Sequence, residues 1–326
     1  MSNGVVVVTG GCGFIGGHLV RRLHAEGRQV RVLDDLSNGD ASHLPPGVDF
    51  RLGDVADATF IRSAIRDAAA VFHLAAIASV QRSNKLWLGA HLTNSVGSVA
   101  VMEAVRDLAP SARFVYASSA AVYGNVELAP GERIAETAPT RPLTPYGIDK
   151  LGSEMHAGAA GSLFGLRVFG LRFFNVYGPG QASDSPYSGV ISRFVAEARS
   201  GDPITVYGDG EQTRDFVHVE DVVAALVAAE MAASPAGPIT NVCTGLATSV
   251  NELAAAIARQ FNPAPAIVRL EARQGDIRRS TGDPTLAGRL LGWQARVTLR
   301  DGLAALVEAE PRANALERTD KAGSSG

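Results

Sequence analysis

Two side chains that could move a proton lie four residues apart in the segment Tyr146-Gly-Ile-Asp-Lys150. On a helix they would share one face, and a lysine ammonium beside a phenol lowers a phenol pKa that starts at about 10. Such a tyrosine can act as a general acid or base near neutral pH when a bound cationic cofactor assists. Ser119 closes the preceding apolar segment FVYASS, where its hydroxyl could hold a substrate oxygen. Tyr-x-x-x-Lys pairs are also common as surface contacts, so the rest of the chain decides the meaning of this one.

A glycine-rich turn near the N-terminus predicts a dinucleotide site. Four consecutive valines, residues 5–8, are typical of a strand buried on both faces, and the turn 10–16 and a helical pattern follow. This order places backbone N–H groups and a helix N-terminus where a pyrophosphate can approach. Asp34 ends the next apolar segment, where its carboxylate can accept from a ribose 2′-hydroxyl and would repel a 2′-phosphate. We therefore predict NAD rather than NADP.

Strand-like and helix-like segments alternate through the first half of the chain, which predicts an α/β fold with a doubly wound parallel Rossmann sheet. We expect the segment 167–180 to complete that sheet. Beyond Asn175 the chain becomes rich in turns, which indicates a smaller, discontinuous α/β substrate domain. The predicted parts are an NAD-binding domain from 1–174 plus 216–243, a nucleotide-sugar-binding domain from 175–215 plus 244–314, and a flexible tail at 315–326.

Three polar residues at the ends of predicted strands leave alternatives open. Asp54 could hydrogen-bond an adenine amino group, or it could cap the helix ATFIRSAI that follows. Ser118 could face the site or cap the following turn. We expect His73, inside a strand, to be a hydrogen-bonded structural histidine, and the small residues Ala75 and Ala76 to let the backbone approach the cofactor.

The composition is that of a globular protein, with 326 residues, 46% hydrophobic and 19% charged. The net charge of −3 argues against a nucleic-acid partner, and the apolar runs are too short or too interrupted to span a membrane. The chain runs from Met1 directly into a strand, which leaves no room for a signal peptide. Cys12 and Cys243, the only cysteines, lack metal-ligand spacing and a disulfide framework, so we expect a cytoplasmic protein without a metal.

Taken together, the motifs resemble the extended short-chain dehydrogenase/reductases and, within them, the nucleotide-sugar 4-epimerases of the UDP-galactose 4-epimerase type. The resemblance spans about residues 3–310. The matching segments are TGGCGFIG at 9–16, LDDLSNG at 33–39, GD at 53–54, FHLAA at 72–76, TNSVGS at 93–98, SSAAVYG at 118–124, YGIDK at 146–150, RFFNVYGPGQ at 172–181, TRDFVHVEDV at 213–222 and RQGDIRRSTGD at 273–283.

The resemblance implies an NAD-dependent 4-epimerase that interconverts UDP-glucose and UDP-galactose through a transient 4-keto sugar. It implies Ser119, Tyr146 and Lys150 as catalytic residues. The implied NAD contacts are Gly10, Gly13, Phe14, Ile15, Gly16, Asp34, Asp35, Asn38, Asp54, Val55, Leu74, Ala75, Ala76, Asn94 and Lys150. The implied UDP-sugar contacts are Ser119, Asn175, Val190, Tyr207, Arg214, Arg273, Asp276 and Ser280. By analogy, helices 91–109 and 146–162 are expected to pair across a homodimer.

Individual residues refine this reading. Ala120 and Ala121 stand where similar dehydratases and decarboxylases carry acids, so elimination lacks its proton donor and acceptor. Ser280 stands beside the implied position of the sugar's C2 substituent, and its small size predicts that N-acetylated UDP-hexoses are also accepted, unless it is only a polar surface residue. Asp149 replaces a commoner small residue, without an expected effect on the chemistry. The alternatives are a UDP-glucuronate 4-epimerase and a non-catalytic NAD-sensing regulator on the same fold.

Overall fold

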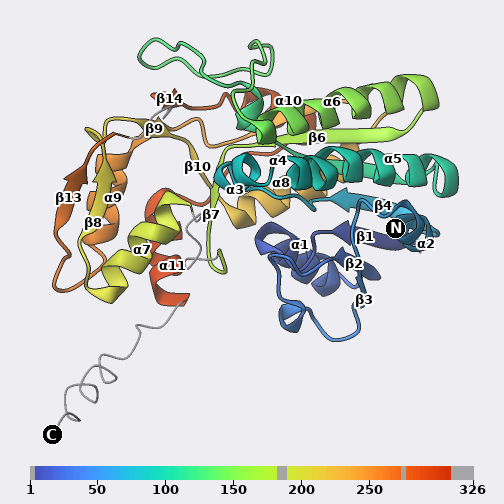
Figure 1. The fold of residues 1–326 in the computed structure, drawn as a ribbon, viewed down its shortest axis with the longest axis horizontal. Coiled ribbons are helices and arrows are strands. Elements are labelled where there is room, and N and C mark those ends of the chain that lie inside the picture. Colours follow the sequence, from blue (N-terminus) through green and yellow to red (C-terminus); the bar gives the residue numbers. More distant parts are fainter. Residues whose placement is uncertain (1–3, 182–188, 273–276, 310–326) are drawn as a thin grey trace, which may run out of the picture.

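The computed structural model describes residues 4–181, 189–272 and 277–309. Within these residues the largest sheet has seven parallel strands in the order β3-β2-β1-β4-β5-β6-β11 (Figure 1). Its strands are β1 (Val5–Thr9), β2 (Val30–Asp34), β3 (Asp49–Leu52), β4 (Ala68–His73), β5 (Arg113–Ser119), β6 (Arg167–Phe173) and β11 (Ile239–Val242). The order reverses direction between β1 and β4, so the predicted doubly wound Rossmann sheet is confirmed.

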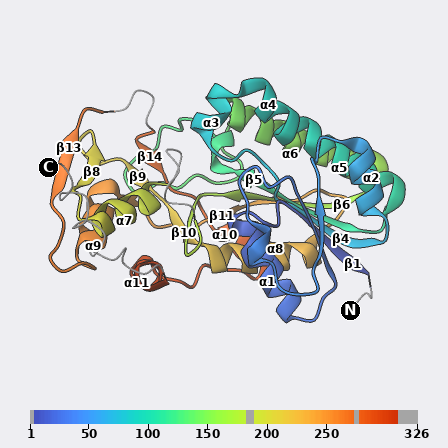
Figure 2. The same ribbon diagram turned by 60° about the horizontal axis from the view of Figure 1, so that its bottom comes forward.

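Helices cover both faces of this sheet, as Figures 1 and 2 show. Val6 and Val8 of β1 pack in one apolar core with α1 and α8, whereas Val7 packs in another with α2, α5 and α6. Successive side chains of a strand point to opposite faces, which is why a run of valines suits a sheet buried on both sides. These helices are α1 (Phe14–Ala25), α2 (Ala58–Ile65), α5 (Gly97–Leu108), α6 (Pro145–Phe164), α8 (Val219–Ala232) and α10 (Thr285–Leu291).

The helix expected over 91–109 is part of a longer helical arm. It comprises α3 (Val80–Lys85), α4 (Trp87–His91), a π-helical turn (Leu92–Val96) and α5. The helix expected over 146–162 is α6, which begins with Pro145 after the cap residue Thr144 and ends before the left-handed Gly165. Single-turn 3₁₀ helices occupy Ala41–His43 and Ala120–Val122.

The prediction that residues 167–180 complete the sheet is wrong. β6 ends at Phe173, and β7 (Asn175–Tyr177) pairs in a separate two-stranded sheet with β10 (Phe216–His218). The chain changes its pairing partner within one residue. The Phe174 N–H still donates to the carbonyl of Val242 in β11, whereas the Asn175 N–H donates to the carbonyl of Asp215, just before β10. Strand β11 lies beyond β6 and forms the edge of the large sheet.

The second half of the chain builds smaller sheets beside the large one (Figure 1). β8 (Ile204–Tyr207) pairs with β13 (Ile267–Leu270), and β9 (Thr213–Arg214) lies between β12 (Thr248–Ser249) and β14 (Arg279–Ser280). The helices α7 (Val190–Ser200), α9 (Val250–Ala258) and α11 (Leu299–Ala309) share an apolar core with β7, β8 and β10. The domain limits given above stay a prediction. None of the described helices is both long and apolar enough to cross a membrane.

Candidate active site

The turn between β1 and α1 brings backbone against backbone. Gly10 has a φ of 70°, and a Cβ there would lie 2.7 Å from the Ala75 nitrogen. A Cβ on Gly16 would lie 2.0 Å from the Gly10 carbonyl oxygen. Gly13 caps α1 without a side chain, so no side-chain oxygen competes for the N–H groups of the first turn, which includes Phe14 and Ile15. A cradle of this kind, which side chains would fill, fits the pyrophosphate of a dinucleotide.

Asp34 joins this turn to the end of β2. Its Oδ2 accepts from the Cys12 N–H at 2.9 Å and its Oδ1 accepts from the Leu36 N–H at 2.9 Å. Burial raises the pKa of Asp34, and the two N–H donors partly offset this shift. Each carboxylate oxygen can accept a second hydrogen bond, so the group can still receive a ribose hydroxyl. Cys12, within the turn, is a buried free thiol.

The outer part of the predicted cofactor site consists of exposed loops. Asp35 accepts from the Ser37 N–H at 2.9 Å, and Asn38 is exposed beyond it. Asp54 is also exposed and accepts from the Ala56 N–H at 2.9 Å. The helix cap is Asp57, which accepts from the Thr59 and Phe60 N–H groups, so the capping alternative for Asp54 is wrong. Asp57 directly precedes the helical pattern, a signal that the sequence contained.

The inner part follows β4 and is tied to the π-helical turn. Leu74, Ala75 and Ala76 are partly buried, and the Leu74 N–H donates to the Thr9 carbonyl at 3.1 Å. Asn94 is fully buried, and its side-chain amide pairs with the backbone of Ile77. Its Oδ1 accepts from the Ile77 N–H at 2.8 Å, and its Nδ2 donates to the Ile77 carbonyl at 3.3 Å. This pairing fixes the loop after β4. Val55 is buried against Gly97 at the start of α5.

The three predicted catalytic residues come together where β5 ends and α6 begins. Ser119 is the last residue of β5, and its side chain lies close enough to Tyr146, in the first turn of α6, to lower the pKa of that phenol. Lys150 is buried one turn later, with its Nζ 5.9 Å from the centre of the Tyr146 ring. The same Nζ donates to the Ala117 carbonyl of β5 at 2.8 Å. The strand and the helix therefore hold a hydroxyl, a phenol and an ammonium at one end of the sheet.

Burial dominates the acidity of these groups. Burial raises the pKa of Tyr146, and the nearby Ser119 side chain opposes the shift. Burial lowers the pKa of Lys150 to about 8, against the opposing negative charges of Asp149 and Glu154. The expected lowering of the Tyr146 pKa by Lys150 is therefore not found, because desolvation of the phenol outweighs an ammonium that is directed at a carbonyl.

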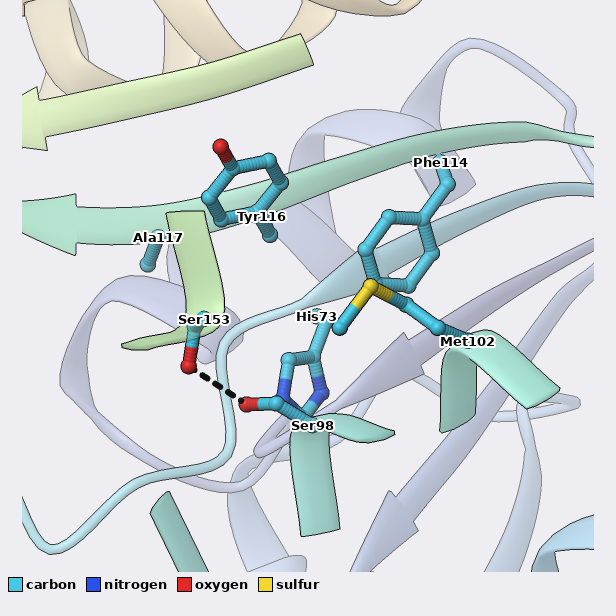
Figure 3. Close-up of a pocket in the computed structure, with 7 residues that line it drawn as sticks. All are labelled: His73, Ser98, Met102, Phe114, Tyr116, Ala117 and Ser153. Carbon is cyan, nitrogen blue, oxygen red and sulfur yellow. Dashed lines mark hydrogen bonds between the residues drawn. The ribbon is translucent and has the colours of Figure 1, made fainter. Parts of the chain in front are cut away.

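A buried chain of hydrogen bonds joins β1 to α6 through His73, which Figure 3 shows beside Ser98 and Ser153. The His73 Nδ1 lies 2.8 Å from the Thr9 hydroxyl, and its Nε2 lies 2.9 Å from the Ser98 hydroxyl. Ser153 of α6 reaches Ser98 at 3.2 Å, the contact dashed in Figure 3. Burial lowers the pKa of His73 to about 3, so it stays neutral, and its prediction as a hydrogen-bonded structural histidine is confirmed.

Ser118 is tied to a buried ion pair. It donates to Glu154 at 2.5 Å, and Glu154 forms a two-point contact with Arg172 at 2.9 and 2.7 Å. The capping alternative for Ser118 is wrong, because Ser119 caps the following turn by accepting from the Ala121 N–H at 3.1 Å. Sequence reasoning missed this ion pair, although Glu154 stands one helical turn after Lys150.

Apart from Ser119, the described residues of the predicted substrate site lie in or next to the smaller sheets and helices of the second half of the chain. Arg214 and Ser280 are register partners in β9 and β14, and an Arg214 Nη1 donates to the Ile277 carbonyl at 2.6 Å. Asn175 begins β7 and Val190 begins α7. Tyr207 is the last residue of β8, and the guanidinium of Arg193 lies over its ring, 5.1 Å from the ring centre. Arg273 and Asp276 lie outside the described residues.

Two sets of hydrogen bonds connect the smaller sheets to the part of the large sheet that contains Ser119. The sequence predicted neither of them. The loop after β5 is pinned beside Ser280, since Ile134 donates to Thr281 at 2.8 Å and accepts from Asp283 at 2.9 Å. Asp215, fully buried, accepts from the N–H groups of Thr244, Gly245 and Gly282. Both tie β14 to the large sheet. Among the described residues, no three His, Cys, Asp or Glu side chains are placed to hold a metal ion.

Comparison with known proteins identifies the family. The model of the NAD dependent epimerase/dehydratase family matches residues 6–243. The chain belongs to this family. Members of the family depend on NAD, and NAD is the cofactor that the glycine turn and Asp34 fit. The predicted resemblance is thereby confirmed at the level of the family.

Individual family members are similar over nearly the whole chain. The UDP-glucose 4-epimerase of Mycolicibacterium smegmatis is 38% identical over 312 residues, 93% of this chain and 97% of the relative. The solved UDP-glucose 4-epimerase of Thermotoga maritima with UDP-glucose superposes with a TM-score of 0.88 at 34% identity, covering 94% of this chain and 98% of that one. MoeE5, solved with UDP-glucuronic acid and NAD, has a TM-score of 0.83 at 37% identity, with coverages of 94% and 98%. Decarboxylases and a dehydratase are also among the similar proteins.

Proposed function

We propose that this protein is an NAD-dependent UDP-sugar 4-epimerase. It inverts C4 of UDP-glucose and UDP-galactose, and of UDP-N-acetylglucosamine and UDP-N-acetylgalactosamine, through a transient 4-keto sugar. The observation that carries this proposal is the meeting of Ser119, Tyr146 and Lys150 at the end of β5, followed by Ala120 and Ala121. Epimerisation needs one base and one hydride acceptor. Elimination needs further acidic groups, which this segment lacks.

The chain's own residues divide the work at C4. The Tyr146 phenolate takes the proton from the sugar 4-hydroxyl and later returns it, while the Ser119 hydroxyl holds the same oxygen. The Lys150 ammonium adds a positive charge within 5.9 Å of the phenol ring. NAD, when bound, would supply the hydride acceptor and donor, and its positive nicotinamide would favour the phenolate. Residues of the turn 10–16 together with Asp34 hold the dinucleotide.

The nucleotide end of the substrate is assigned to the smaller sheets. Arg214 and Arg273 hold the diphosphate, since a guanidinium fork matches phosphate oxygens. Asn175, Val190, Tyr207 and Asp276 contact the rest of the nucleotide, and Ser280 lies beside the sugar. With the nucleotide held at this end, the 4-keto sugar can turn about its diphosphate linkage and present its other face.

Two other functions are tested by the same experiment. A UDP-glucuronate 4-epimerase is supported by the similarity to MoeE5, which was solved with UDP-glucuronic acid. A non-catalytic NAD-binding regulator is disfavoured by the complete set of Ser119, Tyr146 and Lys150. Incubation with a panel of UDP-sugars, followed by separation of the products, distinguishes the three. Turnover of the UDP-hexoses supports our proposal, turnover of UDP-glucuronate alone supports the first alternative, and bound NAD without any turnover supports the second.

The base is tested by Tyr146→Phe, which removes only the hydroxyl. We expect kcat to fall at least ~10²-fold, the usual effect of losing a general base, with NAD and substrate still bound. Tyr116→Phe is the matched control, because Tyr116 is a buried tyrosine of β5 that packs with Phe114 in the core. Turnover near that of the wild type in Tyr146→Phe contradicts the assignment.

We also propose a homodimer that forms through the helical arm and α6. Large apolar side chains are exposed there, with Leu88 at 71%, Trp87 at 64% and Ile148 at 53% exposure. A second copy would cover them. A reducing compartment such as the cytoplasm suits the two buried free thiols of Cys12 and Cys243.

A further inference from the structure

Asp149, the residue before Lys150, is a buried carboxylate with one partner. Its side chain is 4% exposed, and its Oδ1 lies 2.6 Å from the Nδ1 of His91. Its Oδ2 is also buried and has no hydrogen-bond partner among the described residues. His91 is the last residue of α4, and its side chain is 49% exposed. A carboxylate withdrawn from water is costly unless a cation or hydrogen bonds compensate it, so this arrangement calls for a reason.

The pair is one of two ties that flank Lys150 on α6. Asp149 reaches back to His91 on one side. On the other side, the Ser153 hydroxyl lies 3.3 Å from the Asn94 carbonyl and 3.2 Å from the Ser98 hydroxyl. Both ties join α6 to the helical arm that contains the π-helical turn. They set the position of the helix segment from which the Lys150 ammonium reaches the Ala117 carbonyl.

The negative charge of Asp149 also acts on Lys150 directly. Burial lowers the pKa of Lys150 to about 8, and the charges of Asp149 and Glu154 oppose that shift. Glu154 is already matched by the two-point contact with Arg172. Asp149 is therefore the carboxylate beside Lys150 that has no arginine or lysine partner of its own among the described residues.

We propose that Asp149 and His91 form a positioning pair for Lys150, holding the start of α6 against α4 and supplying the negative charge that stabilises the lysine ammonium. The catalytic consequence rests on the proposed function, whereas the effect on Lys150 itself does not. This proposal replaces the expectation that Asp149 has no effect on the chemistry. Titratable and charged groups on the neighbouring elements are Tyr146, Lys150, Glu154 and His156 of α6, His73 of β4, Arg113 and Tyr116 of β5, Arg167 and Arg172 of β6, Arg82 and Lys85 of α3, and Glu103, Arg106 and Asp107 of α5.

The chain allows the ammonium to be observed directly. Its only lysines are Lys85, Lys150 and Lys321, so ¹³C-lysine labelling gives three side-chain signals to follow by NMR as the pH is raised. In the purified protein with its NAD, we expect Asp149→Asn to lower the titration midpoint of Lys150 by roughly one unit, about tenfold in proton affinity. Asp107→Asn, which neutralises an exposed carboxylate paired with Arg62 and Arg106, is the control and should leave the midpoint unchanged.

A second variant tests the positioning part if Asp149→Asn does not fold. His91→Gln removes the partner at a half-exposed site, and we expect faster amide hydrogen exchange in the segment 145–150, with His156→Gln as the control. Equal Lys150 midpoints in Asp149→Asn and wild type, or unchanged exchange in His91→Gln, would overturn the proposal. These measurements use no substrate. If the wild type turns over no UDP-sugar, the proposed function fails, but the NMR titration still tests whether Asp149 and His91 position Lys150. If the wild type does turn over a UDP-sugar, the alkaline limb of its pH profile of kcat should shift to lower pH in Asp149→Asn, together with the Lys150 midpoint.

Discussion

Gly16→Ala and Gly17→Ala each add one methyl group to the first turns of α1, but only the first methyl group would clash with the glycine turn that is predicted to hold the cofactor. Comparing the two variants therefore distinguishes the effect of packing in that turn from the effect of alanine on helix stability. A Cβ at Gly16 would lie 2.0 Å from the Gly10 oxygen and 2.8 Å from both the Gly10 carbonyl carbon and the Gly11 Cα. All three atoms are backbone. A Cβ at Gly17 would meet the end of the Arg21 side chain at 3.5 Å and the Gly11 oxygen at 3.8 Å, which are ordinary contacts.

The two substitutions should therefore have opposite effects. A Cβ contact shorter than 3.0 Å is essentially never seen, so Gly16→Ala must push the turn back by 3.0 − 2.0 = 1.0 Å or more. Such overpacking costs about 1–3 kcal/mol, which cancels or exceeds the roughly 1 kcal/mol that alanine gains over glycine in a helix. Gly17→Ala keeps that gain without the clash, so it should be more stable than the wild type by roughly 0.5–1 kcal/mol.

The effect on the cofactor should be larger than the effect on stability. Hydrogen bonds to a charged group contribute about 1.5–3 kcal/mol each, so displacing one or two N–H donors of the turn should weaken NAD binding by roughly tenfold or more. Calorimetry on protein stripped of NAD measures the affinity, and thermal unfolding measures the stability. Wild-type NAD affinity in Gly16→Ala, or an equal loss of affinity in Gly17→Ala, would refute the packing argument.

Three further predictions follow from buried and exposed side chains. Glu154→Gln leaves the buried Arg172 guanidinium without its counter-charge and should lower the free energy of unfolding by about 3–5 kcal/mol in urea titrations; a loss below 1 kcal/mol would contradict a buried pair. Ser280→Tyr should suppress kcat/KM for the N-acetylated UDP-hexoses and spare the plain pair, whereas equal effects on both pairs would exclude Ser280 from the sugar pocket. Leu88→Glu should convert the proposed dimer to a monomer in light scattering, and a dimer that survives this change would place the interface elsewhere.

The sequence by itself determined the features that depend on near neighbours in the chain. The run of valines, the glycine turn and the aspartate at the end of the next strand predicted the cofactor site, because a strand, a turn and a helix start are each specified within a few residues. Ser119, Tyr146 and Lys150 were singled out in the same way, from the end of one strand and the spacing along one helix.

Only the tertiary structure decided what depends on partners far away in the chain. The strand after Arg167 stops at Phe173 because β11 and Asp215, more than 40 residues further on, offer the next hydrogen bonds. The Tyr146 pKa rises because the fold buries the phenol, which no spacing along the chain reports. The contact between His91 and Asp149 joins residues 58 positions apart. A carboxylate in a sequence has no visible burial or partner, and both are set only when α4 and α6 pack together.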